Sequence, residues 1–519
     1  MRASLELQRS LFRKQRALIS RAVVGKSPAF KRYEQRYRRA TRGYQRLLTA
    51  AQVNAAVAAA DVVYVGDYHT LHVAQEGFLA LARAAAKQGR RLVIALEFVE
   101  GRHQASLDAW LQGTLKDAEF LAAIGHPYRG PFDIWPNFQP LLSWARDGGH
   151  QVLAIDSRAQ GPEALARRDK YAAARIARAA AAEDRPLVLV LVGQFHVAPG
   201  HLPAQVDAAL GRVERKKLVV YQNAEDIYWR LAQEGVAGHA HAALVRPGEI
   251  CLVTASPVVC QQSFLDYVDS EAGDEPLPSQ GAAGAFAELA RRIARLLDID
   301  VEKPLREVKV VTAQDLDLVD QLIERGRFDK RELLRLERHV LSRESAYVPR
   351  ARLAYLARSS LNHVAEEATH FVRHVAVQDA MDAPRPLADA FWARCLEEAL
   401  GFFGSRLLNP ARKCPQLADF ADSFSTRGAQ RETAAFVLAL KAAECDGPAA
   451  CRPLLPLSDE AQFHAVSHAL GYLLGEALHH AFEHGRFEAL EVRSLFYDPF
   501  RHAEGRYFAL AARLFGTRR

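Results

Sequence analysis

The chain has 519 residues, of which 49% are hydrophobic and 25% are charged. These fractions match an average globular protein and exclude a disordered, collagen-like or fibrous chain. At roughly 100–200 residues per domain, the length predicts several domains. The six cysteines include no Cys-x-x-Cys pair, which disfavours zinc ribbons, thioredoxin-like motifs and covalently attached haem.

Residues 1–55 are expected to form a basic helical arm. Residues 1–50 hold 14 Lys and Arg against two acids, a charge of +12, so a net charge of +7 leaves −5 for the other residues. Apolar residues recur between these charges at near-helical spacing, at Leu7, Leu11, Leu18 and Ile19. Such a helix can lie on an anionic membrane or on nucleic acid, and peripheral contact with an anionic membrane is one expectation for residues 1–50. A solvated helix that packs on the next domain is the other.

The sequence contains no run of 18 apolar residues and therefore predicts no membrane span. Arg9, Arg13 and Arg16 interrupt the apolar segment that a signal peptide requires, so the expected location is the cytoplasm. Because the basic charge is confined to the arm, we expect no specific binding of nucleic acid by the folded domains. A homodimer is compatible with the sequence.

Residues 56–267 alternate short apolar runs with helical stretches, which predicts an α/β domain with a mainly parallel sheet. The runs are continuous rather than alternating, as expected for strands that are buried on both faces. They occupy residues 61–66, 91–98, 151–156, 186–193, 217–222 and 249–255. The insertion at 101–147 is rich in aromatic residues and is expected to form a helical wall or lid.

A segment that contains Pro, Gly, Ser and several acids, 268–285, is expected to be a linker. Beyond it, residues 286–519 have an almost entirely helical hydrophobic periodicity and predict an all-α domain. The expected fold is therefore a basic arm, an α/β domain and an all-α domain.

Ionisable residues follow several of the expected strands, where the carboxyl ends of a parallel sheet commonly form a ligand site. The first and fourth runs end in Gly-x-x-His, which places His69 and His196 there, and the second run contains Glu97. Two histidines with a carboxylate suit Zn, Mn or Fe, and they can equally act as an acid/base set for hydrolysis. Hydrogen bonding in a helix cap or in the core is the structural alternative.

These phrases resemble the ChaN-like haem-binding uptake family over about residues 60–260. The similar blocks are GDYHTLHVAQEGFLALARAAAKQGRRLVIALEF, FDIWPNFQPLLSWARDGGHQVLAIDSR and LVGQFHVAPGHLP. The family shares a superfamily with the Tiki metalloproteases, the TraB/PrgY proteins and the erythromycin esterases. The resemblance implies an α/β fold with His69, Glu97 and His196 at the carboxyl edge of its sheet. Asp67 stands where Glu is commoner in the first block, and residues 286–519 have no counterpart in the small members.

The resemblance also implies haem or iron as a ligand. Haem requires an apolar crevice and an axial ligand such as His or Tyr, and the aromatic insertion could supply the crevice. The candidate binding residues are Tyr68, His72, His126 and Tyr128, and His69 is a further candidate for ligation. For any single aromatic residue of this set, a place in the core is the alternative.

A second group of candidate ligands lies in the expected all-α domain. Two Glu-x-x-His pairs, Glu367 with His370 and Glu476 with His479, each occupy one face of an expected helix. Paired Glu-x-x-His helices hold two metal ions in ferritin-like bundles. Hydrogen bonding between helices explains the same residues without a metal.

Two functions are consistent with these patterns. The favoured hypothesis is a ChaN-like haem- or iron-binding protein with its ligand at the carboxyl edge of the sheet. The alternative is a hydrolase of peptide or ester bonds, in which His69, Glu97 and His196 bind a divalent transition metal (Fe, Mn or Zn) or act as acid/base groups.

Overall fold

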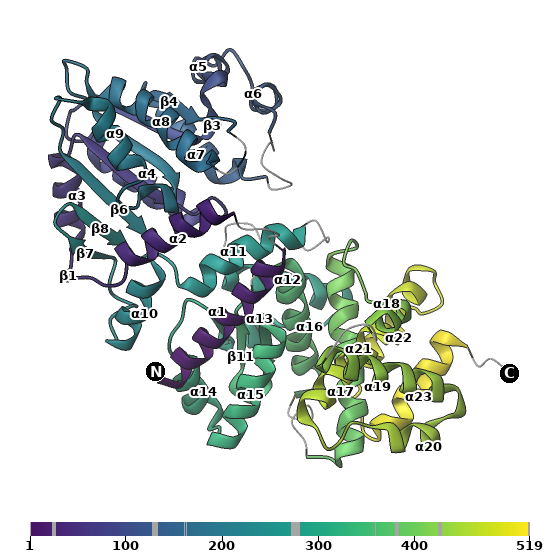
Figure 1. The fold of residues 1–519 in the computed structure, drawn as a ribbon. Helices are drawn as coiled ribbons and strands as arrows, with labels where there is room; N and C mark the ends of the chain where they lie inside the picture. The colour runs from purple at the N-terminus through teal and green to yellow at the C-terminus, as the bar shows by residue number, and fades with distance from the viewer. Residues whose placement is uncertain are drawn as a thin grey trace. The chain divides into compact units, whose positions relative to one another are not determined.

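The structure is a computed structural model, and it describes residues 2–22, 27–126, 133–159, 161, 163–270, 281–358, 360–378, 384–423 and 428–516. The chain divides into two compact units (Figure 1). Residues 12–267 form one of them, the sheet unit, and residues 268–519 together with residues 3–11 form the other, the helical unit. Helix α1 (Arg2–Ala22) contributes to both.

The sheet unit contains an eight-stranded sheet in the order β1-β7-β8-β6-β2-β5-β3-β4. All the neighbouring pairs from β8 to β4 are parallel, whereas β1 pairs with β7 and β7 with β8 in the antiparallel sense. The strands are β1 (Arg46–Leu47), β2 (Val62–Asp67), β3 (Leu92–Glu100), β4 (Gln151–Asp156), β5 (Leu187–Gly193), β6 (Lys217–Gln222), β7 (Ala242–Arg246) and β8 (Glu249–Leu252). The mainly parallel α/β fold expected from the sequence is thus confirmed, and each of the six apolar runs overlaps one of the strands.

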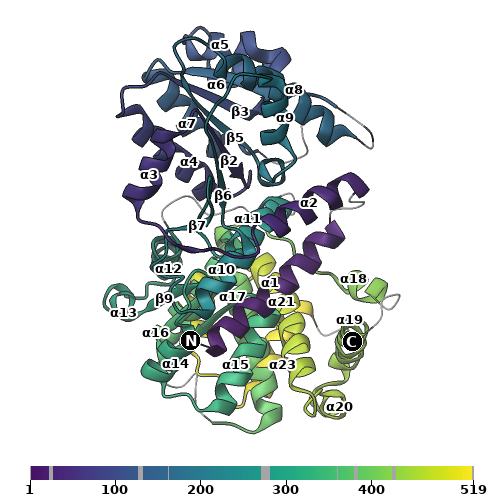
Figure 2. The ribbon, with the colours of Figure 1, turned by 60° about the vertical axis from the view of Figure 1, so that its left-hand side comes forward.

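Helices cover both faces of this sheet, which explains why its central strands are apolar on every side. Figure 2 views the sheet nearly edge-on, with α3, α4 and α7 on one face and α8 and α9 on the other. The helices of the sheet unit beyond α1 are α2 (Pro28–Ala40), α3 (Ala50–Ala59), α4 (His72–Ala86), α5 (Gln104–Leu111), α6 (Asp117–Ile124), α7 (Trp135–Asp147), α8 (Ala164–Ala180), α9 (Leu202–Leu210), α10 (Glu225–Gln233) and α11 (Pro257–Ser270).

The aromatic insertion forms α5, α6 and α7, and its large side chains enter the core on one face of the sheet. Trp110, Phe120 and Phe138 are almost completely buried there against the side chains of β3. Trp135 packs edge-on against Trp110, with the ring centroids 5.8 Å apart. The insertion is therefore a wall of the domain rather than a separate lobe.

The helical unit is built mainly from long helices, as expected, and the described residues also include a small three-stranded sheet in the order β10-β11-β9. Its strands are β9 (Lys309–Thr312), β10 (Ser345–Val348) and β11 (Leu353–Leu356). The helices are α12 (Ala282–Leu297), α13 (Glu302–Glu307), α14 (Leu318–Gly326), α15 (Lys330–Arg343), α16 (Leu361–Val377), α17 (Leu387–Leu408), α18 (Leu417–Asp422), α19 (Ala429–Ala443), α20 (Pro448–Cys451), α21 (Glu460–Glu483), α22 (Ala489–Tyr497) and α23 (Ala503–Phe515).

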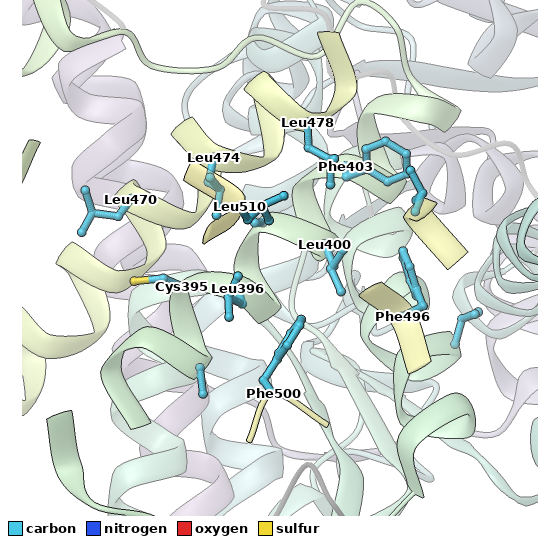
Figure 3. Packing of buried hydrophobic residues seen from close by; sticks show 14 of the residues in the cluster. Cys395, Leu396, Leu400, Phe403, Leu470, Leu474, Leu478, Phe496, Phe500 and Leu510 are labelled. Atoms are coloured by element: carbon cyan, nitrogen blue, oxygen red, sulfur yellow. The ribbon is translucent and has the colours of Figure 1, made fainter. Parts of the chain in front are cut away.

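The core of the helical unit lies around α17 and α21. Figure 3 shows Leu396, Leu400 and Phe403 of α17 among Leu474 and Leu478 of α21. These side chains recur every three or four residues, so each helix turns one apolar stripe toward its neighbour. None of the helices within the described residues is long and apolar enough to cross a bilayer.

Candidate functional site

A pocket of about 390 Å³ opens at the carboxyl ends of β2, β3 and β5. Its lining is mostly aromatic and aliphatic, with ionisable groups at the strand ends. The three residues expected at this edge, His69, Glu97 and His196, all line it, as do Tyr68 and His126. Loops and helix starts at the carboxyl edge of a parallel sheet converge in this way because all the strands end on the same side.

The two glycines of the Gly-x-x-His phrases are required by close approach of the chain. A Cβ at Gly193 would lie 3.3 Å from Glu97 Oε2 and 3.5 Å from His69 Nε2. A Cβ at Gly66 would lie 3.1 Å from the Cα of Gln194. A side chain at Gly193 would therefore press on the Glu97 carboxylate, which would have to move by a few tenths of an ångström.

His69 is oriented by a carboxylate. Its Nδ1 lies 2.7 Å from Asp67 Oδ2, and Gln75 Nε2 donates a hydrogen bond of 2.6 Å to the other oxygen of Asp67. Because a carboxylate accepts hydrogen bonds, this contact places the ring proton on Nδ1 and the lone pair on Nε2. The Asp67 side chain is buried, which holds the pair in a fixed geometry.

His196 has the same kind of support from a different element. Its Nδ1 lies 2.5 Å from Oδ1 of Asp169, a buried residue of α8. The hydroxyl of Tyr33, from α2, donates a hydrogen bond of 2.8 Å to Asp169 Oδ2. The lone pair of His196 is thereby directed to Nε2, as in His69.

Glu97 lies between the two imidazole rings. Its Oε2 is 3.7 Å from His69 Nε2, and its Oε1 is 3.9 Å from His196 Nε2. The Gly193 N–H donates a hydrogen bond of 2.6 Å to Oε2. Arg168 donates to Oε1 and also bonds Asp156 Oδ1 at 2.8 Å, so its guanidinium compensates two buried carboxylates.

The other candidate binding residues fall inside and outside the pocket. Tyr68 lines it, and burial raises the pKa of its phenol well above the usual value. His126 also lines the pocket, where its Nε2 lies 3.0 Å from Asp133. His72 instead pairs with Glu76 at 3.1 Å in the first turn of α4, away from the lining residues. Tyr128 lies outside the described residues.

Aromatic rings form the apolar part of the pocket. The rings of Phe98 and Phe138 are stacked with their centroids 4.6 Å apart. Phe30 of α2 packs edge-on against Phe195, at 5.3 Å. Both pairs line the same pocket, which gives it two aromatic sides.

Several residues of the site were not expected from the sequence, and they include Tyr33, Arg168 and Asp169. Arg168 and Asp169 stand in a highly charged helix, where charge runs usually mark a solvated face. Tyr33 stands in the basic arm, far along the chain from every strand end. The sequence carries no local signal that separates these residues from ordinary surface positions.

The candidate metal ligands of the helical unit do not gather at one point. Glu367 accepts hydrogen bonds from Ser345 Oγ and the Tyr347 N–H, at 2.7 and 2.6 Å. Glu476 pairs with Arg406 at 3.6 Å, and His479 Nδ1 lies 3.5 Å from Glu483. The spacing places each Glu and His on one helix face, but Glu367, Glu476 and His479 each contact a different partner.

A different group of three residues in the helical unit comes closer together. Potential ligand atoms of Glu366, His370 and Glu398, all buried, lie within 4.8 Å of one another. Arg412 bonds Glu366 at 2.7 Å, however, and Arg394 pairs with Glu398 at 2.5 Å. The two guanidinium groups already neutralise the two carboxylates, so the group fits a buried charge network better than a cation site. A metal ion in the helical unit stays a prediction.

Two solved structures are similar to parts of this chain. One is that of ChaN of Campylobacter jejuni, which describes cofacial heme binding; it is 16% identical, covers 34% of this chain and 86% of its own, and has a TM-score of 0.25. The other is the type III effector HopBA1, which is 16% identical, covers 40% of this chain and 95% of its own, and has a TM-score of 0.29. No curated protein matches the sequence.

A comparison with protein-family models gives a match over residues 53–168, which run from α3 into α8 and include His69 and Glu97. The matching family is described as "Haem-binding uptake, Tiki superfamily, ChaN". Residues 53–168 of the sheet unit therefore resemble the ChaN haem-binding uptake family of the Tiki superfamily.

Proposed function

We propose that the pocket of the sheet unit binds haem and that His69 is the residue that would hold its iron. The observation that carries this proposal is the orientation of His69, whose Nδ1 is held by Asp67 at 2.7 Å within an aromatic-lined pocket. Histidines that bind a metal almost always give their other ring N–H to a carboxylate, a carbonyl or water. The family that residues 53–168 resemble is named for haem binding.

The volume and the aromatic lining of the pocket suit a flat, largely apolar ligand such as haem. Its volume of about 390 Å³ lies within the usual range for a small-molecule site, about 300–1,000 Å³. Phe98 and Phe138 supply flat apolar contacts near His69, whose ring lies 6.4 Å from that of Phe138. When bound, haem would supply an iron centre whose reactivity depends on its axial ligand and on the polarity of the pocket.

His69 is a better haem ligand than Tyr68 and His126, the other candidate haem-binding residues that line the pocket. Tyrosine binds haem iron as a phenolate, but burial raises the pKa of Tyr68 and keeps its phenol protonated at neutral pH. His126 is engaged through Nε2 by Asp133. His69 is engaged through Nδ1, which directs the lone pair of Nε2 toward the side of Glu97.

The proposal is tested by titrating haem into the purified full chain and following the Soret absorbance. We expect saturable binding, and we expect His69→Ala to weaken haem affinity by about 100-fold or more. Loss of a group that only orients a metal ligand already costs about 10–100-fold in affinity, and loss of the ligand itself should cost at least as much. His72→Ala is the matched control, because His72 stands three residues away and pairs with Glu76 outside the pocket lining. Absence of a Soret change in the unaltered chain, or equal affinities for His69→Ala and the control, would overturn the proposal.

A second candidate function rests on the position of Glu97 between two histidines. Its two oxygens lie 3.7 and 3.9 Å from the Nε2 atoms of His69 and His196, and each ring has a carboxylate behind it. Such a set can hold a divalent transition metal or exchange protons during hydrolysis. The compensating contact from Arg168 weighs against a metal, because that guanidinium already neutralises Glu97.

The two candidates respond differently to Glu97→Gln. This change keeps the shape of the side chain and its contact with the Gly193 N–H, but it removes the negative charge. A hydrolase that uses Glu97 would lose metal content or ester-cleaving activity, whereas haem ligation by His69 would persist. Elemental analysis, an ester-hydrolysis assay and a Soret titration, each carried out on Glu97→Gln and on the unaltered chain, distinguish the hydrolase from the haem-binding protein.

A further inference from the structure

Helix α2 supplies part of the wall of the pocket. Phe30 and Tyr33 of this helix line the pocket together with the residues at the strand ends. The helix is held there by its own aromatic contacts, because Tyr37 packs edge-on against Phe195 and Tyr221, with ring centroids 5.4 and 5.7 Å apart. A segment that the sequence presents as a basic arm thus contributes side chains to the site.

Tyr33 contacts the polar groups of the pocket in two ways. Its hydroxyl donates a hydrogen bond of 2.8 Å to Asp169 Oδ2, while Asp169 Oδ1 lies 2.5 Å from His196 Nδ1. Its ring stacks on that of His201, with centroids 3.6 Å apart and planes 15° from parallel. Asp169 and His196 are buried and Tyr33 is half-buried, so the Tyr33 hydroxyl extends their chain of hydrogen bonds to the wall of the pocket.

We infer that Tyr33 is a positioning residue of the site, which acts on His196 through Asp169. A carboxylate with one partner can rotate about its own axis, but one that is held at both oxygens cannot do so without breaking a hydrogen bond. Tyr33 therefore fixes the plane of Asp169 and, through it, the direction of His196 Nε2 toward Glu97. The expected effect on ligand binding rests on the proposed function of the pocket. The effect on the orientation of His196 is independent of that function.

The variant that tests this inference is Tyr33→Phe. It removes the hydroxyl and keeps the ring that stacks on His201 and the helix contacts made by Phe30 and Tyr37. Tyr44→Phe is the matched control, since the Tyr44 hydroxyl also bonds a carboxylate, that of Glu234, but lies outside the pocket lining. Both variants are made in the full chain, and circular dichroism checks that the fold is retained.

The first measurement follows His196 directly and needs no ligand. A buried imidazole N–H that bonds a carboxylate gives a far-downfield proton resonance, which His196→Gln assigns by its loss. We expect Tyr33→Phe to broaden or shift this resonance, because Asp169 then has one partner fewer, and we expect Tyr44→Phe to leave it unchanged. An identical resonance in Tyr33→Phe and the unaltered chain would overturn the inference.

The second measurement connects the geometry to the ligand. Haem affinity is determined from the Soret titration, and the band position reports the surroundings of the iron. We expect Tyr33→Phe to weaken haem binding by about tenfold, the effect of one hydrogen bond to a charged group, and to shift the band. A changed proton resonance without any haem binding would contradict the proposed function alone, whereas unchanged affinity and band position in Tyr33→Phe would contradict the role of Tyr33 in ligand binding.

Discussion

At the scale of single residues, Glu367 makes the clearest prediction about stability. The carboxyl of this α16 residue is buried beside β10, and burial, together with the charges of Glu366 and Glu398, raises its pKa from 4.5 to about 8. The native state therefore keeps a proton that the unfolded chain releases above about pH 4.5. By linkage, the free energy of unfolding falls as the pH rises from about 4.5 to about 8.

We expect Glu367→Gln to remove this pH dependence. The amide retains an acceptor for the Tyr347 N–H and a partner for Ser345 Oγ, so it resembles the protonated acid. The variant should be more stable than the unaltered chain by an amount on the order of a few kcal/mol at pH 8 and differ little at pH 4.5. Urea unfolding at both pH values measures the difference.

Glu483→Gln is the control for this experiment, because its carboxylate, on α21, is 53% exposed. We expect it to leave the pH dependence as it is. A Glu367→Gln variant whose stability changes with pH as steeply as that of the unaltered chain would refute the interpretation.

The sequence predicts some residues of the pocket and not others for a physical reason. His69, Glu97 and His196 follow or end strands, so a one-dimensional pattern locates them at the same edge of a sheet. Asp169 and Tyr33 reach that edge from helices, where any charged or aromatic residue has the same local signal as a solvated one. In the helical unit, the Glu-x-x-His spacing pairs Glu367 with His370, but it is Glu366 that lies close to His370. The two glutamates point about 100° apart around their helix, and both lie about one turn from His370, so the spacing alone does not distinguish them.

At the scale of elements, the close packing of α17 against α21 depends on two glycines. A Cβ at Gly471 would lie 2.7 Å from the Cys395 carbonyl oxygen, and one at Gly475 would lie 2.5 Å from that of Ala399. The backbone atoms of a neighbouring helix cannot move aside as the end of a flexible side chain can, so a Cβ at either position would push the two helices apart. We expect Gly471→Ala and Gly475→Ala each to lower the free energy of unfolding by about 1–3 kcal/mol.

Gly505 provides the matched comparison within another helix. It stands in α23, and a Cβ there would meet no atom within 4 Å. Gly505→Ala should therefore stabilise the chain by up to about 1 kcal/mol, from helix propensity alone. Thermal unfolding followed by circular dichroism measures all three variants, and equal shifts for Gly471→Ala and Gly505→Ala would contradict the packing argument.

The elements that the sequence predicts are those with a long, uniform pattern. The six apolar runs became β2 to β6 and β8, because strands covered on both faces are apolar throughout. Strand β1 has two residues, and β9, β10 and β11 have four each. Such lengths are too short for an alternation to be recognised, and they form only because a neighbouring strand provides the hydrogen bonds.

At the scale of the whole molecule, the described residues of each unit include a large hydrophobic core of that unit's own. One core gathers the side chains of the sheet and of α3 to α7, and the other surrounds α17 and α21. Every residue that lines the candidate haem pocket belongs to residues 12–267. A unit with its own core can in principle fold alone, so the pocket should not need the helical unit to form.

We therefore expect a fragment of residues 12–267 to fold cooperatively and to bind haem as tightly as the full chain does. Circular dichroism and thermal unfolding test the first part, and Soret titration of the fragment and the full chain in parallel tests the second. A fragment that folds but binds haem at least about tenfold more weakly would show that the helical unit contributes to the site. In that case the sheet unit would not bind haem independently of the helical unit. His69→Ala in the full chain would still abolish haem binding, so the assignment of His69 as the iron ligand would stand.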